Sequence, residues 1–194
     1  RALLAAPALL LGAPGRAAAE RVLADATGRR IAVPDLVARV FPAGPPAAIL
    51  LYTLAPGMLA GWPARPPRPA EAAFMLPEAA ALPQIGRLTG RDNTANVEAV
   101  LAQRPDLVLD YGSVGATYVS LAERVREQTG LPVLLLDGAL PRIPETYRML
   151  GGILGVAEAA AARAEAAQRI LDGAREAAET LRARGRPRVL YLRG

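Results

Sequence analysis

The sequence contains no cysteine, no histidine and no lysine, and its only serines are Ser113 and Ser120. Without cysteine or histidine, the chain cannot form disulfides, a Cys-rich zinc site or a catalytic centre with a histidine base. Without lysine, it also lacks the basic residue of a phosphate-binding P-loop. These absences exclude several common classes of hydrolase, redox protein and nucleotide-binding enzyme.

The charge of the chain comes from arginine alone. All 23 basic residues are arginine, and with 18 acidic residues they give a formal net charge of +5. The arginines are scattered rather than clustered with aromatic residues, so no nucleic-acid partner is expected. The chain has 194 residues, of which 52% are hydrophobic. This length and composition predict a globular protein of one domain, or one domain with part of another.

Residues 1–19 have the pattern of an export signal. Arg1 precedes an apolar run of ten residues that is too short to span a bilayer, and small residues at 17–19 resemble a cleavage site. We interpret 1–19 as part of a signal peptide, with a buried N-terminal helix as the alternative. The protein is therefore predicted to be periplasmic, and the lack of cysteine predicts that it carries no lipid anchor.

The first half of the chain alternates short apolar segments with turn signals. A helix over 71–80 is expected to be interrupted by Pro77. Pro63 to Pro69 contains four prolines and two arginines and is expected to be a loop. Strands are predicted at 21–24, 30–33, 38–41 and, less regularly, 58–62, with a helix over 47–54.

The middle of the chain predicts a parallel sheet. Segments 107–109 and 133–136 are unbroken apolar strands, and an amphipathic helix over 117–128 separates them. A crossover helix of this kind makes the two strands parallel, and their continuous apolar sequence means that both faces are covered. A helix over 95–103 precedes this unit, with Asn93 and Thr94 as capping residues. The pattern predicts an α/β fold with a Rossmann-like parallel sheet.

Two long elements are expected after this sheet. A helix over 145–154 is followed by residues 157–184, which contain no proline and predict a second helix roughly 42 Å long. Residues 188–192 then have the pattern of a new strand. The long helix has an apolar stripe at Ile170, Ala174, Ala177 and Leu181, and expected ion pairs at Glu165–Arg169 and Arg175–Glu179.

A ligand site is expected where the parallel strands end. Ligands of open parallel sheets bind beyond the carboxyl ends of the strands, which here are 42–45, 110–113 and 137–138. The predicted ligand-binding residues are Trp62, Arg87, Tyr111, Gly112 and Ser113. Aromatic rings and guanidinium groups at one edge suit a bulky, flat or anionic ligand.

Structural roles are the alternatives for these residues. Trp62 and Tyr111 could serve only in packing, Asp110 and Asp137 could cap loops or helix starts, and Arg65 and Arg68 could be solvated. The 112–115 loop lacks the G-x-G-x-x-G spacing of a dinucleotide site. No catalytic residue and no metal ligand is predicted.

Several segments, in order, resemble one protein family. They are 25–34, an opening hairpin; 96–109, which is the most specific match and follows Gly86 and Arg87; 129–137; 154–156, which leads into the long helix; and 189–194. Together they are similar to the periplasmic substrate-binding proteins of ABC importers for ferric siderophores, haem and vitamin B12.

The resemblance implies a two-lobed protein of which this chain carries the first lobe. It implies residues 1–19 as signal peptide, 20–155 as the ligand-binding lobe, 156–185 as the interlobe helix and 186–194 as the start of a second lobe. The solute would lie between the lobes, at the strand ends identified above. The lack of histidine disfavours a bare metal ion and favours a chelated one.

The resemblance also implies a role without chemistry. The chain would capture a ferric siderophore, haem or cobalamin as a monomer and deliver it to the permease at the inner membrane. Glu98 matches the acidic residue with which this lobe docks on the permease, although a carboxylate in a first helical turn is also favoured by the helix dipole. The alternatives are an enzyme on a doubly wound sheet, acting on a nucleotide or phosphorylated substrate, and a sensor module of the same fold.

Overall fold

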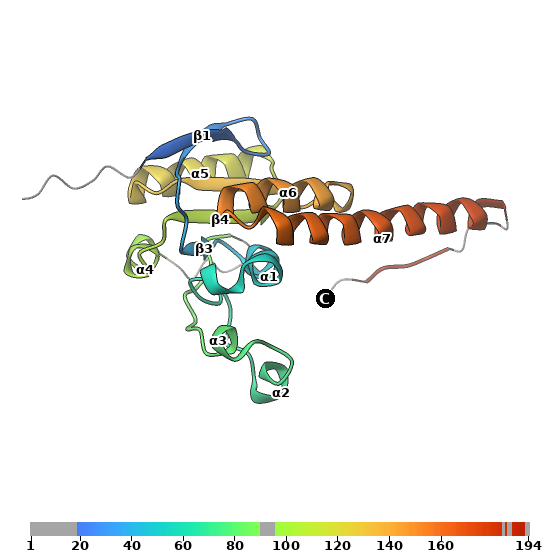
Figure 1. The fold of residues 1–194 in the computed structure, drawn as a ribbon, viewed down its shortest axis with the longest axis horizontal. Helices are drawn as coiled ribbons and strands as arrows, with labels where there is room; N and C mark the ends of the chain where they lie inside the picture. Colours follow the sequence, from blue (N-terminus) through green and yellow to red (C-terminus); the bar gives the residue numbers. More distant parts are fainter. Residues whose placement is uncertain (1–18, 90–95, 184, 186–187, 193–194) are drawn as a thin grey trace, which may run out of the picture.

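The structure is a computed structural model that describes residues 19–89, 96–183, 185 and 188–192 (Figure 1). Strands β1 (Glu20–Ala24) and β2 (Arg30–Pro34) form an antiparallel hairpin. Strands β3 (Val40–Pro42), β4 (Leu107–Gly112) and β5 (Val133–Asp137) form a parallel sheet in the order β3-β4-β5. The predicted α/β fold with a parallel sheet is confirmed.

Helices connect and cover these strands. No helix among the described residues is both long enough and apolar enough to cross a membrane. The α-helices are α1 (Pro45–Leu54), α2 (Pro69–Ala72), α3 (Pro77–Ala80), α4 (Val97–Ala102), α5 (Ala116–Thr129), α6 (Ile143–Leu154) and α7 (Ala157–Ala183), and 3-10 turns occur at Pro56–Met58 and Leu140–Arg142.

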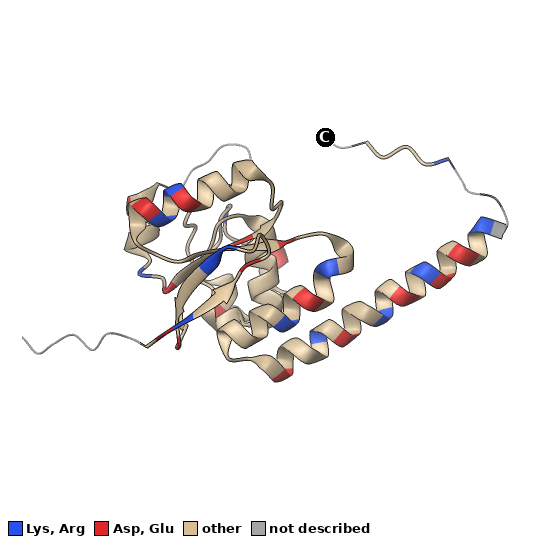
Figure 2. Cartoon of the chain, turned by 90° about the horizontal axis from the view of Figure 1, so that it is seen from above, with Lys and Arg blue, Asp and Glu red and all other residues tan. Residues whose placement is uncertain are grey.

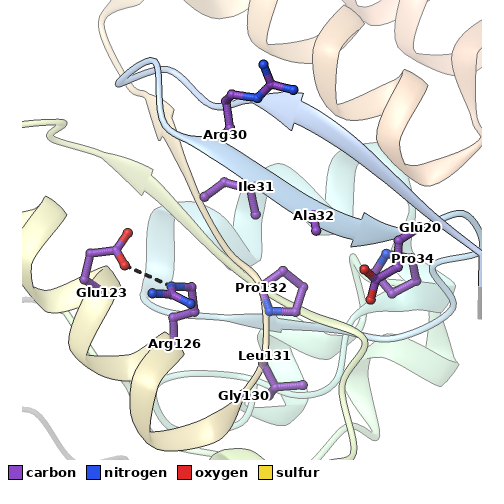
Figure 3. Close-up of a pocket in the computed structure, with 10 residues that line it drawn as sticks. All are labelled: Glu20, Arg30, Ile31, Ala32, Pro34, Glu123, Arg126, Gly130, Leu131 and Pro132. Atoms are coloured by element: carbon purple, nitrogen blue, oxygen red, sulfur yellow. Dashed lines mark hydrogen bonds and ion pairs between the residues drawn. The ribbon is translucent and has the colours of Figure 1, made fainter. Parts of the chain in front are cut away.

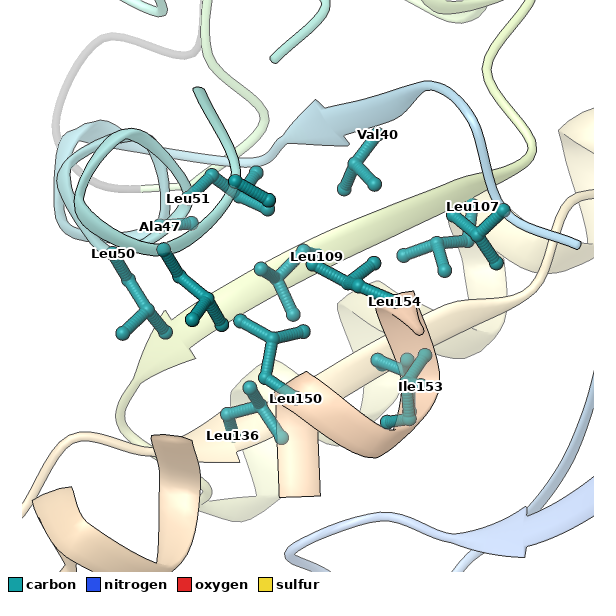
Figure 4. Close-up of a cluster of buried hydrophobic side chains, with 14 of the residues drawn as sticks. Val40, Ala47, Leu50, Leu51, Leu107, Leu109, Leu136, Leu150, Ile153 and Leu154 are labelled. Carbon is teal, nitrogen blue, oxygen red and sulfur yellow. The ribbon is translucent and has the colours of Figure 1, made fainter. Parts of the chain in front are cut away.

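The sheet is buried on both faces, as its continuous apolar strands predict. Successive side chains of a strand point to opposite faces, so Leu107 and Leu109 pack against α1 and α6, whereas Val108 packs against α4 and α5. Figure 4 shows the first of these two cores, in which Leu150 of α6 lies against the sheet. Each face therefore has its own hydrophobic core.

A buried carboxylate attaches the β1–β2 hairpin to the sheet. The side chain of Asp25 is fully buried and accepts hydrogen bonds from Thr27, from the guanidinium of Arg29 and from the backbone N–H of Leu135 in β5. Burial alone would raise the pKa of Asp25, but the hydrogen bonds from Thr27 and Arg29 outweigh it and lower the pKa. Arg29 also pairs with Glu123 of α5 at 2.7 Å.

Helix α7 packs on α6 only over its first turns. Gly155 ends α6 in the left-handed conformation, with φ at 70°, and the chain turns back so that Ala160 faces Gly151. Beyond Ala164 the helix extends away from the sheet, with acidic and basic residues along its length (Figure 2). The expected apolar stripe is exposed there, since Ile170 retains 72% of its accessible surface.

Three expectations about local structure in the first half are corrected. Residues 58–62 form no strand, because Ala60 bonds to β3 whereas Trp62 bonds to Pro83, so no continuous ladder develops. The helix expected over 71–80 with an interruption at Pro77 is two separate turns, α2 and α3, and the break lies at 73–76, just before Pro77. The side chain that caps α4 is Asn96, whose Oδ1 accepts from the N–H of Ala99 at 2.8 Å; the predicted caps at 93 and 94 lie outside the described residues.

Two expectations near the C-terminus are also corrected. Residues 188–192 form no strand, and their apolar side chains are at least 80% exposed, because no described strand lies alongside for them to pair with. In α7, Arg175 pairs with Asp172 at 2.6 Å rather than with Glu179. Most of the predicted signal segment lies outside the described residues, and the domain boundaries remain predictions.

Candidate functional site

The carboxyl ends of the three parallel strands meet at one edge of the sheet, as predicted. The N–H of Ala43, just after β3, donates to the carbonyl of Leu109 in β4 at 2.8 Å. The N–H of Gly138, just after β5, donates to the carbonyl of Gly112 at 2.8 Å. Segments 42–44, 110–113 and 137–138 therefore lie side by side and form what we call the carboxyl edge.

Glycine is required where β4 and β5 end. Gly112 has φ at 154°, a conformation that side-chain-bearing residues rarely adopt. A Cβ atom on Gly138 would lie 2.7 Å from the Cα of Gly112, so the two backbones approach too closely for a side chain. Ser113 is exposed directly after this point. The predicted glycine loop is thus an open stretch of backbone at the carboxyl edge.

Backbone hydrogen bonds bring Arg87 to the same edge. Gly86 has a positive φ of 79°, and the next two N–H groups after Arg87, those of Leu88 and Thr89, both donate to the carbonyl of Ala43. Arg87 is therefore held beside the end of β3, although 45 residues separate it from Pro42 in sequence. Its role in ligand binding remains a prediction.

Trp62 is built into the protein as a packing residue. Its indole N–H donates to the carbonyl of Ala79 in α3 at 2.8 Å, and its ring lies 5.9 Å from that of Tyr52 in α1, tilted by 52°. Tyr52 in turn accepts a hydrogen bond from the backbone N–H of Leu76. The two aromatic residues thus hold the 69–80 segment against the body. The packing alternative is confirmed for Trp62, and contact with a ligand remains a prediction.

Tyr111 is half-buried at the carboxyl edge. Burial raises the pKa of its phenol, and the neighbouring Tyr147 and Asp137 raise it further. Tyr111 is therefore a neutral hydrogen-bond donor across the physiological pH range. Tyr147, from α6, was not predicted, because a tyrosine in the middle of a helix carries no sequence signal for a site.

Asp110 is buried at the end of β4. Burial raises the pKa of its carboxyl despite hydrogen bonds from the backbone of Tyr111 and the hydroxyl of Thr89. The Thr89 hydroxyl lies 3.4 Å from Asp110 Oδ1. The carboxyl of Asp110 thus helps to hold Thr89, two residues after Arg87, at the end of β4. This is a structural role, similar to the loop capping that the sequence offered as the alternative for Asp110.

Glu98 lies apart from these residues, in the first turn of α4. It is exposed, and its carboxylate accepts a hydrogen bond from the side chain of Asn96 at 3.2 Å. This position fits the helix-dipole interpretation. The proposed contact with a permease is not tested by the geometry of this chain.

A different hollow, of about 500 Å³, opens at the opposite end of the sheet. Figure 3 shows it between β2 and the segment that enters β5, with residues 130–132 along one side. Glu123 and Arg126 at its border form an ion pair at 2.9 Å, and Glu123 also binds Arg29. Glu123 and Arg126 therefore satisfy each other, whereas Glu20 and Arg30, which also line the hollow, form no ion pair within the described part of the chain. No group of three or more acidic side chains among the described residues is placed to hold a metal ion.

No protein-family model and no curated protein matches this sequence. Solved structures do match its fold. An ABC transporter solute binding protein from Sulfurospirillum deleyianum DSM 6946 gives a TM-score of 0.67 at 24% identity, over 79% of this chain and 48% of that one.

Two further solved structures match the same fold. A TroA-like periplasmic binding protein, FepB, from Veillonella parvula gives a TM-score of 0.58 at 24% identity, over 74% of this chain and 45% of that one. The molybdate periplasmic binding protein MolA of Haemophilus influenzae gives 0.55 at 16% identity, over 72% and 48%. The chain therefore has the fold of the ABC-transporter solute-binding proteins and spans about half the length of the structures it matches.

Proposed function

We propose that this chain is the first lobe of the solute-binding component of an ABC importer, acting in the periplasm. In this role it captures a chelated iron compound, either a ferric siderophore or haem, or cobalamin, and delivers it to the permease. The observation that carries the proposal is the carboxyl edge, to which Tyr111, Gly112 and Ser113 belong and at which the backbone of Arg87 is held beside the end of β3, on the fold of solute-binding proteins. No reaction is part of this role.

The chemistry of the carboxyl edge supports a bulky solute. Tyr111 offers an aromatic face and a neutral hydroxyl, the backbone of Arg87 is held at the same edge, and a Cβ atom added at Gly112 would meet no atom within 4 Å. Aromatic rings bind flat ligands by stacking, and guanidinium groups bind carboxylates or other anionic oxygens. The alternative of an enzyme gains no specific support from any described residue.

Delivery to the permease is the second half of the proposal. Glu98 is exposed in a first helical turn and stands away from the carboxyl edge. It could therefore contact a membrane partner while the solute is bound. An exposed carboxylate of this kind suits an arginine on that partner.

A thermal-shift titration tests solute capture. The chain, in the longest form that its gene encodes, would be heated with haemin, a ferric hydroxamate, a ferric catecholate, cobalamin or molybdate, with an iron-free siderophore as control. A bound ligand at 100 times its Kd stabilises the native state by about 2.7 kcal/mol. This raises the Tm of a chain of this size by roughly 5–10 °C.

The pattern across this panel decides the outcome. A saturable rise in Tm with one iron chelate or cobalamin, and none with the iron-free siderophore, supports the proposal. Quenching of Trp62 fluorescence at the same ligand concentrations would give a second estimate of Kd. A rise with molybdate alone would replace the proposed solute by an oxyanion, and no rise with any ligand would contradict solute capture.

A further inference from the structure

An apolar groove of about 360 Å³ lies between α1 and α6. Its volume is at the lower end of the range for small-molecule sites. We call it the α1–α6 groove, and it is lined by Pro45, Pro46, Ile49, Leu50, Thr53, Tyr111, Ile143 and Tyr147.

The groove is continuous with the carboxyl edge. Helix α1 starts at Pro45, three residues after β3 ends, and α6 starts at Ile143, six residues after β5 ends. The first turns of both helices therefore form walls at the strand ends. Tyr111 belongs to both places, because it is part of β4 and also lines the groove. A solute held at the carboxyl edge could extend into the groove without a break.

The lining selects for an uncharged ligand. None of the lining side chains is charged, and the surface of the groove is mostly apolar. Thr53 and Tyr147 satisfy each other, with their hydroxyl oxygens 3.0 Å apart. The Tyr111 hydroxyl makes no hydrogen bond within the described part of the chain, so it can donate to an oxygen of a ligand. An oxyanion would find no cation in this groove to balance its charge.

We propose that the α1–α6 groove binds an uncharged, flat apolar part of the captured solute, and that the Tyr111 hydroxyl donates a hydrogen bond to an oxygen on that part. This inference rests on the proposed function and specifies it: the solute carries an apolar or aromatic moiety and is not a small oxyanion. Ile49, which is 61% exposed at the rim, gains most from being covered by such a moiety.

Isoleucine methyl NMR tests the groove directly. The chain contains only six isoleucines, of which Ile49 and Ile143 line the groove. Ile170 is a matched control, because it is 72% exposed on α7, outside the groove. The probe is 2-naphthol, an uncharged bicyclic ring with one hydroxyl, followed by haemin. We expect saturable shifts of the Ile49 and Ile143 δ1 methyls and none of Ile170. Equal shifts at Ile170 would mean non-specific apolar binding and would overturn the proposal.

Two matched variants give a second test. We expect Ile49→Asp to weaken 2-naphthol binding at least tenfold, because a carboxylate would be desolvated by the ligand, and Ile170→Asp to leave it unchanged. Circular dichroism checks that both variants fold, and Ile49→Ala replaces Ile49→Asp if the latter does not. Tyr111→Phe should weaken binding several-fold, since it removes only the hydroxyl. Unchanged affinity in the Ile49 variant would refute the groove as the binding site.

The Tm measurements and the methyl spectra together distinguish failure of this inference from failure of the proposed function. If haemin or another panel ligand raises the Tm without shifting Ile49 or Ile143, solute capture stands and the groove is refuted. If 2-naphthol binds in the groove but no panel ligand binds the chain, the groove stands as an apolar site and the proposed function falls. If neither binds, both proposals are wrong.

Discussion

The contact between α6 and α7 can be tested with a single methyl group. Gly151 of α6 faces Ala160 of α7, and a Cβ atom added at Gly151 would lie 2.1 Å from the Cβ of Ala160. Two carbon atoms in contact prefer about 3.5–4.0 Å. Because each methyl is fixed to its own backbone, no rotamer change relieves the overlap, and the helices must separate. We therefore expect Gly151→Ala to carry an overpacking cost of about 1–3 kcal/mol.

The neighbouring glycine provides the reference. Gly152 lies in the same helix, but a Cβ added there meets no atom within 4 Å. Both substitutions gain about 1 kcal/mol of intrinsic helix propensity, so the difference between Gly152→Ala and Gly151→Ala isolates the overlap. We expect Gly152→Ala to be the more stable variant by about 1–3 kcal/mol in urea unfolding followed by circular dichroism.

A double-mutant cycle completes this test. Replacing Ala160 by glycine removes the methyl that Gly151→Ala would meet, so the two changes together should recover most of the overpacking cost. Equal stability of the Gly151→Ala and Gly152→Ala variants, within about 0.5 kcal/mol, would refute the packing of α7 on α6. A cycle without coupling between positions 151 and 160 would refute it as well.

Two buried carboxyls give predictions with opposite pH dependence. Asp25→Ala should lower the free energy of unfolding by about 1–3 kcal/mol at pH 7, because it removes the buried carboxylate that accepts from Thr27, Arg29 and the N–H of Leu135, and Arg29 keeps only its pair with Glu123 and its bond to the carbonyl of Val133. Asp172→Ala on the exposed face of α7 should change it by less than about 0.5 kcal/mol. The folded pKa of Asp25 is lowered, so its contribution to the free energy of unfolding is present above the unfolded pKa near 3.8 and is lost as the pH falls through the folded pKa. The destabilisation by Asp25→Ala should therefore shrink when urea unfolding is repeated at low pH. A destabilisation that does not depend on pH would contradict this. The folded pKa of Asp110 is raised, so its ionised carboxyl destabilises the folded state at pH 7. Asp110→Asn should therefore raise the urea concentration at the unfolding midpoint at pH 7, and this gain should disappear below the unfolded pKa, where the carboxyl is protonated in both states. A lower midpoint for Asp110→Asn at pH 7 would contradict the assigned burial.

The parallel sheet could be predicted because its strands carry a strong local signal. Residues 107–109 and 133–136 are apolar without interruption, and both are buried on both faces in the structure. Gly130 ends α5 with φ at 71°, as its position after an amphipathic helix indicates. Patterns of this kind depend on residues close in sequence.

Features that depend on distant residues were harder to predict. Residues 188–192 have a strand pattern, but a strand forms only with a partner, and no described strand lies alongside. Trp62 packs against distant segments, through its indole N–H on the carbonyl of Ala79 and its ring beside Tyr52, and its contact with a ligand stays a prediction.

The α1–α6 groove, too, depends on residues that are distant in sequence. It joins Thr53, Tyr111 and Tyr147, which are separated by up to 94 residues. Their proximity follows from how two helices pack on one face of the sheet. No spacing within the sequence could have indicated this.

The central claim is that solute is captured at the carboxyl edge, separately from docking at Glu98. The most direct test is the Kd of haemin, or of whichever panel ligand binds most tightly, for the unmodified chain and for the Tyr111→Ala and Glu98→Ala variants. The account predicts at least about tenfold weaker binding for Tyr111→Ala, which loses a half-buried aromatic contact at the strand ends. It predicts an unchanged Kd for Glu98→Ala. Unchanged binding in the Tyr111→Ala variant, or weakened binding in the Glu98→Ala variant, would contradict it.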